Sequence, residues 1–147
     1  MATAGLLPVM ASKDQSRHME TRTEFIERIR RLSERAEDDR QSFQPPSDPP
    51  DEDQAMEYLR TGAGPAISLF VEARTGGCAV RFPPDAYHAL EDAMNTWFEL
   101  YAACYGVDLD AEFALREAAA VLVDTHNIRD VAVVLTRVPR SDVPGRD

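Results

Sequence analysis

Lysine is almost absent from this chain. Lys13 is the only lysine among 16 basic residues, and 26 acidic residues bring the formal net charge to -10. Excess carboxylates keep a small protein soluble, because the molecules repel one another. The same repulsion within one molecule destabilises its fold in dilute buffer, and molar salt removes most of this effect because it shortens the screening length to about 3 Å. The composition is therefore typical of halophilic, acidic proteins, although a GC-rich genome also favours arginine over lysine. The acidic balance argues against nucleic acid as a partner, because binding by counterion release needs uncompensated positive charge.

Long apolar runs and paired cysteines are also missing. No stretch reaches the roughly 18 uninterrupted apolar residues that a membrane span requires, so we expect a cytoplasmic protein without membrane contact. Cys78 and Cys104 have no CxxC partner and lie inside apolar patterns. Such cysteines indicate buried thiols in a reducing compartment, and Cys104 has no histidine or basic neighbour at a helical spacing that would activate it.

The sequence contains no nucleophile elbow, no HExxH, no EF-hand loop and no Walker motif. The glycine-rich stretch Gly62-Ala63-Gly64-Pro65 follows a predicted helix and precedes a predicted strand. A phosphate-binding loop requires the opposite order of strand, loop and helix. These absences predict a protein with no cofactor, no metal ion and no chemistry of its own.

Composition divides the chain into five segments. Residues 1–18 carry Lys13 and Arg17 against Asp14, a charge opposite to that of the remainder, and are predicted to be a disordered leader. Residues 19–43 are predicted to form an amphipathic helix. Residues 44–53 contain four prolines among acidic residues and form a Pro-rich acidic linker. Residues 54–138 are predicted to form an α+β domain, and residues 139–147 a disordered tail.

Periodicity within the domain predicts one short helix at about 51–61, ended by Gly62, and two long helices, one at 85–105 and one from about 108 or 110 to 125. Residues 66–74 and 78–82 alternate apolar and polar side chains, which predicts a β-hairpin. Residues 131–138 are apolar on both faces, which favours an inner strand. The expected fold is α+β: a three-stranded sheet, made of the hairpin and the C-terminal strand, covered by an α-helical hairpin.

The N-terminal helix places apolar side chains along one face. Because a three-stranded sheet leaves its second face open, we expect this helix, from the same chain or from a second copy, to cover it. The predicted interaction residues are Phe25, Ile29, Leu32 and Ala36.

Two residues are weak catalytic candidates. His88 stands one turn before Asp92, but a metal site would need a third ligand, from His126 or Asp124 on the next helix. The favoured interpretation is a solvated polar stripe. Glu91 borders the aromatic face, where a carboxyl group acts as a general acid or base if its pKa is raised. Pairing with an arginine is the simpler role for Glu91, and the possible partners are Arg81, Arg116 and Arg129.

An aromatic row recurs at helical spacing in residues 85–105, and such a row forms a core more often than a ligand pocket. Its members are Tyr87, Trp97, Phe98, Tyr101 and Tyr105. We therefore predict a non-enzymatic protein-interaction or self-association domain, with a homodimer as one form. The alternative is a small-molecule-binding protein or hydrolase-like enzyme that uses the aromatic helix face with Glu91 and His88.

Overall fold

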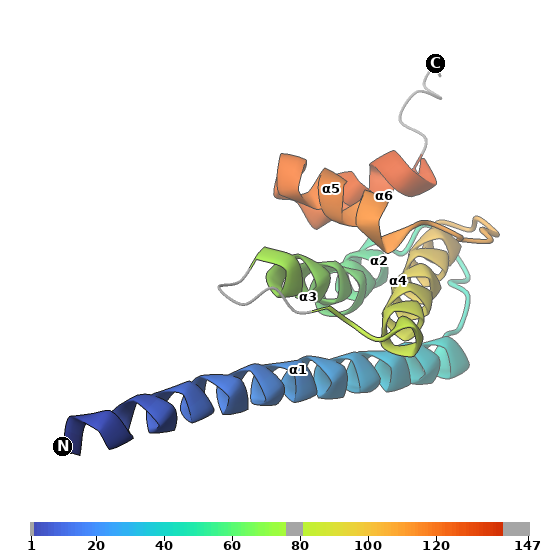
Figure 1. The fold of residues 1–147 in the computed structure, drawn as a ribbon. Coiled ribbons are helices and arrows are strands. Elements are labelled where there is room, and N and C mark those ends of the chain that lie inside the picture. Colours follow the sequence, from blue (N-terminus) through green and yellow to red (C-terminus); the bar gives the residue numbers. More distant parts are fainter. Residues whose placement is uncertain (1, 76–80, 140–147) are drawn as a thin grey trace.

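The computed structural model describes residues 2–75 and 81–139, with side chains from Arg22 onward. Every regular element in this part of the chain is helical (Figure 1). The elements are α1 (Ala2–Ser42), α2 (Glu52–Tyr58), the π-helical turn η1 (Leu59–Ala63), α3 (Gly64–Thr75), α4 (Pro84–Cys104), α5 (Leu115–Thr125) and α6 (Ile128–Thr136). No helix within the described ranges is long and apolar enough to cross a membrane.

The predicted α+β fold, with its three-stranded sheet over residues 54–138, is wrong. The first predicted strand, 66–74, lies within α3, and most of the predicted C-terminal strand forms α6. Of the strand predicted at 78–82, residues 78–80 lie outside the described residues, and Arg81 and Phe82 are not in a strand. The buried residues of α3 include Ala66, Phe70 and Ala73, which recur at the helical spacing of three or four. A short apolar run fits the period of a strand as well as that of a helix, and the packing of neighbouring helices selects the helix.

Gly62 was predicted to end the short helix but lies inside a continuous helical run from α2 through η1 into α3. The π-helical turn ends two residues before Pro65, whose ring and missing N–H interrupt the regular i→i−4 hydrogen bonds. A Cβ on Gly62 would lie 2.4 Å from ring atoms of Trp97. Glycine is therefore required at this position by the close approach of α4, and not by a helix end.

The predicted long helix at 85–105 is confirmed as α4, which begins at Pro84 and ends at Cys104. Gly106 then turns the chain with φ +78°. The stop of α5 is made by His126, which adopts φ 56° and donates its N–H to the Leu122 carbonyl at 2.7 Å. Asn127 then begins α6: its side-chain oxygen accepts the N–H groups of Arg129 and Asp130.

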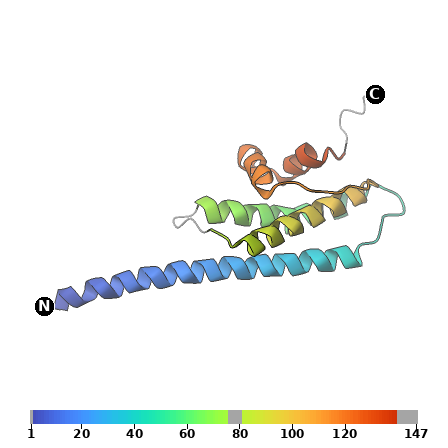
Figure 2. The same ribbon diagram turned by 45° about the vertical axis from the view of Figure 1, so that its right-hand side comes forward.

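Helix α4 is the centre of the core, and α1 packs along it (Figure 2). Trp97, Phe98 and Tyr101 are fully buried on α4. The residues predicted for association lie on the covered side of α1: Phe25, Ile29 and Ala36 are buried and Leu32 packs against the core. This apolar row is therefore covered within its own chain.

The N-terminal helix is longer than predicted. Helix α1 begins at Ala2, where the sequence predicted a disordered leader over residues 1–18, and it ends at Ser42. Residues 43–51, between α1 and α2, contain no regular helix, and residues 52 and 53 of the predicted linker belong to α2. The tail predicted at 139–147 lies outside the described residues beyond Pro139.

Candidate functional site

A ladder of polar side chains on α4 holds the extended segment that precedes α5. Glu91, Asn95 and Glu99 are spaced four residues apart, about 6 Å along a helix. They bind backbone N–H groups that are spaced two residues apart, about 6.6 Å along an extended chain. The two spacings match, so each side chain can bind the next N–H group in turn. The hydrogen bonds run from Ala111 N to Glu99 (3.0 Å), from Phe113 N to Asn95 (2.9 Å), from Asn95 to the Phe113 carbonyl (3.1 Å) and from Leu115 N to Glu91 (2.9 Å).

This ladder explains why α5 begins at Leu115 and not at the predicted residue 108 or 110. The N–H groups of the preceding segment are bound to α4. Of the stripe predicted to be solvated, His88 and Asp92 are exposed, whereas Asn95, about one turn further along α4, is only 9% exposed. Glu91 and Glu99 are half-buried. The carboxylate of Glu91, a residue of α4, lies against the first N–H group of α5, and the dipole of α5 favours a negative charge at this end.

The weak catalytic candidates are not brought together into a reactive site. One carboxylate oxygen of Glu91 accepts the Leu115 N–H, and none of the ion pairs among the described residues includes Glu91. His88 and Asp92 are both exposed. Among the described side chains, those of residues 22–75 and 81–139, no three histidine, cysteine or acidic groups are placed so that they could hold a metal ion.

The aromatic row divides between core and surface. Trp97 donates its indole N–H to Asp39 at 2.8 Å, and the Tyr101 hydroxyl donates to the Val138 carbonyl at 2.6 Å. Tyr87 is half-buried at the start of α4 and packs edge-on against Phe70, with ring centroids 5.9 Å apart. Burial, followed by the charge of nearby Glu91, raises the pKa of the Tyr87 hydroxyl. Tyr87 also lines a cavity.

Cys104 is fully buried, and burial raises the pKa of its thiol to about 11. The thiolate is the reactive form of cysteine, so this side chain is inert at neutral pH, as its sequence context predicted. Cys78, the other cysteine, lies outside the described residues.

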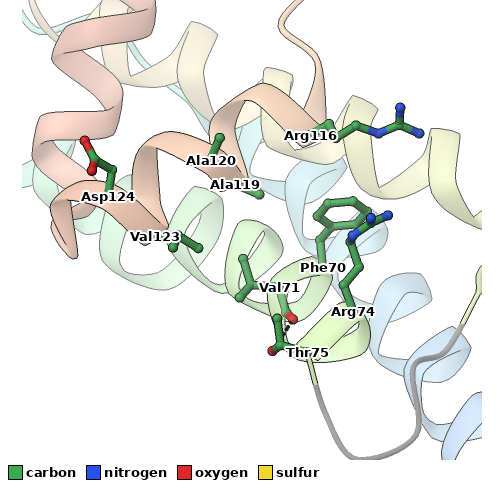
Figure 3. A pocket seen from close by; sticks show the side chains of 9 residues that line it. All are labelled: Phe70, Val71, Arg74, Thr75, Arg116, Ala119, Ala120, Val123 and Asp124. Atoms are coloured by element: carbon green, nitrogen blue, oxygen red, sulfur yellow. Dashed lines mark hydrogen bonds between the residues drawn. The ribbon is translucent and has the colours of Figure 1, made fainter.

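An apolar groove of about 500 Å³ lies between α3 and α5 (Figure 3). Phe70 and Val71 contribute its α3 side, and Ala119, Ala120 and Val123 contribute its α5 side. Val123 is 54% exposed, among the most exposed large hydrophobic side chains of the described part. Figure 3 shows Arg74 and Arg116 at one end of the groove, beside the Phe70 ring, and Asp124 at the other end.

A second cavity of about 380 Å³ continues the groove beyond Phe70 and is basic and aromatic. It shares Phe70, Arg74 and Arg116 with the apolar groove. The Arg74 guanidinium lies over the Phe70 ring, 5.4 Å from its centroid. The residues that only this basic pocket contains are Arg81, Phe82, Pro84, Tyr87 and His88. Groove and pocket together form one surface with an apolar half and a basic half.

Sequence reasoning missed this surface, because half of it lies on α3, which was predicted to be a strand. The sequence indicated Arg81 and Arg116 only as possible partners of Glu91, and Phe70 lies in the segment 66–74 that was predicted to be a strand. The one local signal was the cluster of aromatic side chains on either side of Pro83-Pro84.

No curated protein matches this chain, and no solved structure matches it. One family model matches residues 23–140, a range that includes the core helices α2 to α6, the part of α1 that packs on α4, and every residue of the groove and the basic pocket. The chain therefore belongs to the family described as Domain of unknown function (DUF8055).

Proposed function

We propose that this protein is a non-enzymatic binding module that holds a segment of a partner protein in the groove between α3 and α5. The observation that supports this proposal is the apolar lining of the groove together with the exposure of Val123. Contiguous exposed apolar surface is costly in water and commonly marks an interaction site. The row at Phe25 and Ile29, first predicted to associate, is already buried inside the chain, so the groove takes its place.

The enzymatic alternative has less support. It relied on Glu91 and His88, and Glu91 is engaged in holding the start of α5. A polar cavity of about 670 Å³ lies next to the ladder, but its α4 side chains Asn95 and Glu99 also bind backbone groups. Side chains with these structural hydrogen bonds are poorly placed to transfer protons to a substrate.

A matched pair of substitutions tests the proposal. Val123 and Val134 are both 54% exposed and both lie in helices, but only Val123 lines the groove. We expect Val123→Asp to abolish co-purification of the partner from native cell extract in high salt, and Val134→Asp to leave it unchanged. Light scattering of the isolated protein would show whether the partner is a second copy. Equal recovery of the partner with the two variants would contradict the proposal.

A further inference from the structure

We propose that the segment held in the groove is acidic: its apolar side chains lie along Val71 and Val123, and its carboxylates bind Arg74, Arg81 and Arg116. This inference rests on the proposed function and adds the chemical class of the partner. It predicts an amphipathic segment of another protein with a row of apolar residues and acidic residues grouped at one end.

The charges around the basic pocket support an anionic occupant. Three arginines line a single cavity in a chain whose net charge is -10. The ion pairs among the described residues are Arg28 with Glu72, Arg30 with Glu27 and Arg60 with Glu57, so none involves the three pocket arginines. No acidic residue appears among the described residues that line the pocket.

Glu91 and Arg116 both lie close enough to the Tyr87 hydroxyl for their charges to act on it. One oxygen of the Glu91 carboxylate accepts the Leu115 N–H. At the opposite end of the apolar groove stands Asp124. The surface is therefore basic at one end and acidic at the other, and the two ends give a bound acidic segment a defined direction.

The geometry of the arginines suits carboxylates. A guanidinium presents a planar fork of N–H donors that matches a carboxylate, and stacking on an aromatic ring reduces the freedom that binding must remove. Arg74 is held in this way over Phe70. Apolar side chains spaced three and four residues apart are the usual anchors of a helix in an apolar groove. Phe70 lies where the apolar and basic halves meet, so both kinds of contact can be made by one segment.

A protein segment fits the overall charge better than a long polyanion does. Nucleic acid or an anionic membrane extends over a wide surface and would be repelled by the net charge of -10. A short acidic segment contacts only the local arginines, and its more distant repulsion is screened. The test includes an anionic membrane as a separate outcome.

The first experiment measures the anion preference with two fluorescent probes. Anilinonaphthalene sulfonate has an aromatic body and a negative charge, and N-phenylnaphthylamine has the same body without the charge. We expect Arg74→Gln combined with Arg116→Gln to weaken the sulfonate by roughly tenfold, since exposed charge pairs each give up to about fivefold, and to leave the neutral probe nearly unchanged. Arg60→Gln is the matched control, because Arg60 lies outside both cavities. Equal loss of both probes, or no loss of the sulfonate, would overturn the inference.

The second experiment identifies the source of the carboxylates by displacing the bound sulfonate from the full chain. The displacers are an amphipathic peptide of leucine and alanine with glutamates at one end, the same peptide with glutamines, and vesicles of phosphatidylglycerol. We expect displacement by the glutamate peptide alone. Displacement by both peptides would keep the groove as a protein-binding site and overturn only the acidic partner. Failure of the glutamate peptide, or displacement by the vesicles alone, would overturn the inference.

Discussion

Gly62→Ala is the most informative single substitution in the core. A Cβ at this position would lie 2.4 Å from two atoms of the Trp97 ring and 2.6 Å from a third. The ring has no space to retreat, because Trp97 is fully buried and its N–H is bound to Asp39 at 2.8 Å. The Arg35 guanidinium lies over the same ring, 5.7 Å from its centroid.

Two effects of opposite sign decide the outcome at Gly62. Alanine favours a helix over glycine by about 1 kcal/mol, which would stabilise the protein. Overpacking a core costs about 1–3 kcal/mol. If the Trp97 ring must also move away from Asp39, its hydrogen bond to this charged acceptor is lost, which costs about a further 1.5–3 kcal/mol. The steric cost is the larger effect, so we expect a net loss of about 2 kcal/mol, or a melting midpoint lower by roughly 5–10 °C.

Urea unfolding followed by circular dichroism measures this difference. Trp97 is the only tryptophan in the chain, so its fluorescence gives an independent probe of the parent and of Gly62→Ala. In the Trp97→Phe background the smaller ring relieves the contact, and the cost of the alanine should fall to nearly zero. Ser68→Ala, at an exposed position of α3, controls for helix propensity and should stabilise slightly. A Gly62→Ala protein as stable as the parent would refute the steric argument.

Three further predictions concern the ladder, alkaline pH and salt. Asn95→Ala removes both hydrogen bonds to Phe113 and should lower the free energy of unfolding in urea by about 2–3 kcal/mol. The helix-cap variant Asn127→Ala should lower it by about 1 kcal/mol. Equal losses in the two variants would show that the ladder contributes little to stability. Burial raises the pKa of the Cys104 thiol from 9.0 to about 11, so the stability that the protonated thiol contributes is complete below about pH 9 and is lost as the pH rises toward 11. The free energy of unfolding of Cys104→Ala should therefore depend less on pH in this window than that of the parent. An unchanged pH dependence would contradict the raised pKa of Cys104. Molar potassium chloride should raise the melting midpoint, because it screens a net charge of -10; a flat or falling midpoint would remove the halophilic interpretation.

The sequence by itself determined the features that depend on neighbouring residues. Pro83, Pro84 and Asp85 start α4 and Gly106 ends it, because proline fixes φ in a first turn and glycine accepts a positive φ. The burial of Trp97 and Tyr101 and the inert environment of Cys104 also followed from helical periodicity. These predictions succeeded because the spacing of apolar residues over a long segment has only one regular solution.

Only the tertiary structure decided the shorter elements and the candidate site. The apolar residues of α3 and α6 fit strand and helix equally well over so few positions, and contacts with α4 and α5 select the helix. The late start of α5 depends on the hydrogen bonds that the Phe113 and Leu115 N–H groups donate to Asn95 and Glu91 of a different helix, α4. The groove likewise joins Phe70 of α3 to Arg116 of α5. Local spacing predicts which side chains are buried, but the partners that cover them and bind their backbone are distant in sequence and are fixed only when the helices pack.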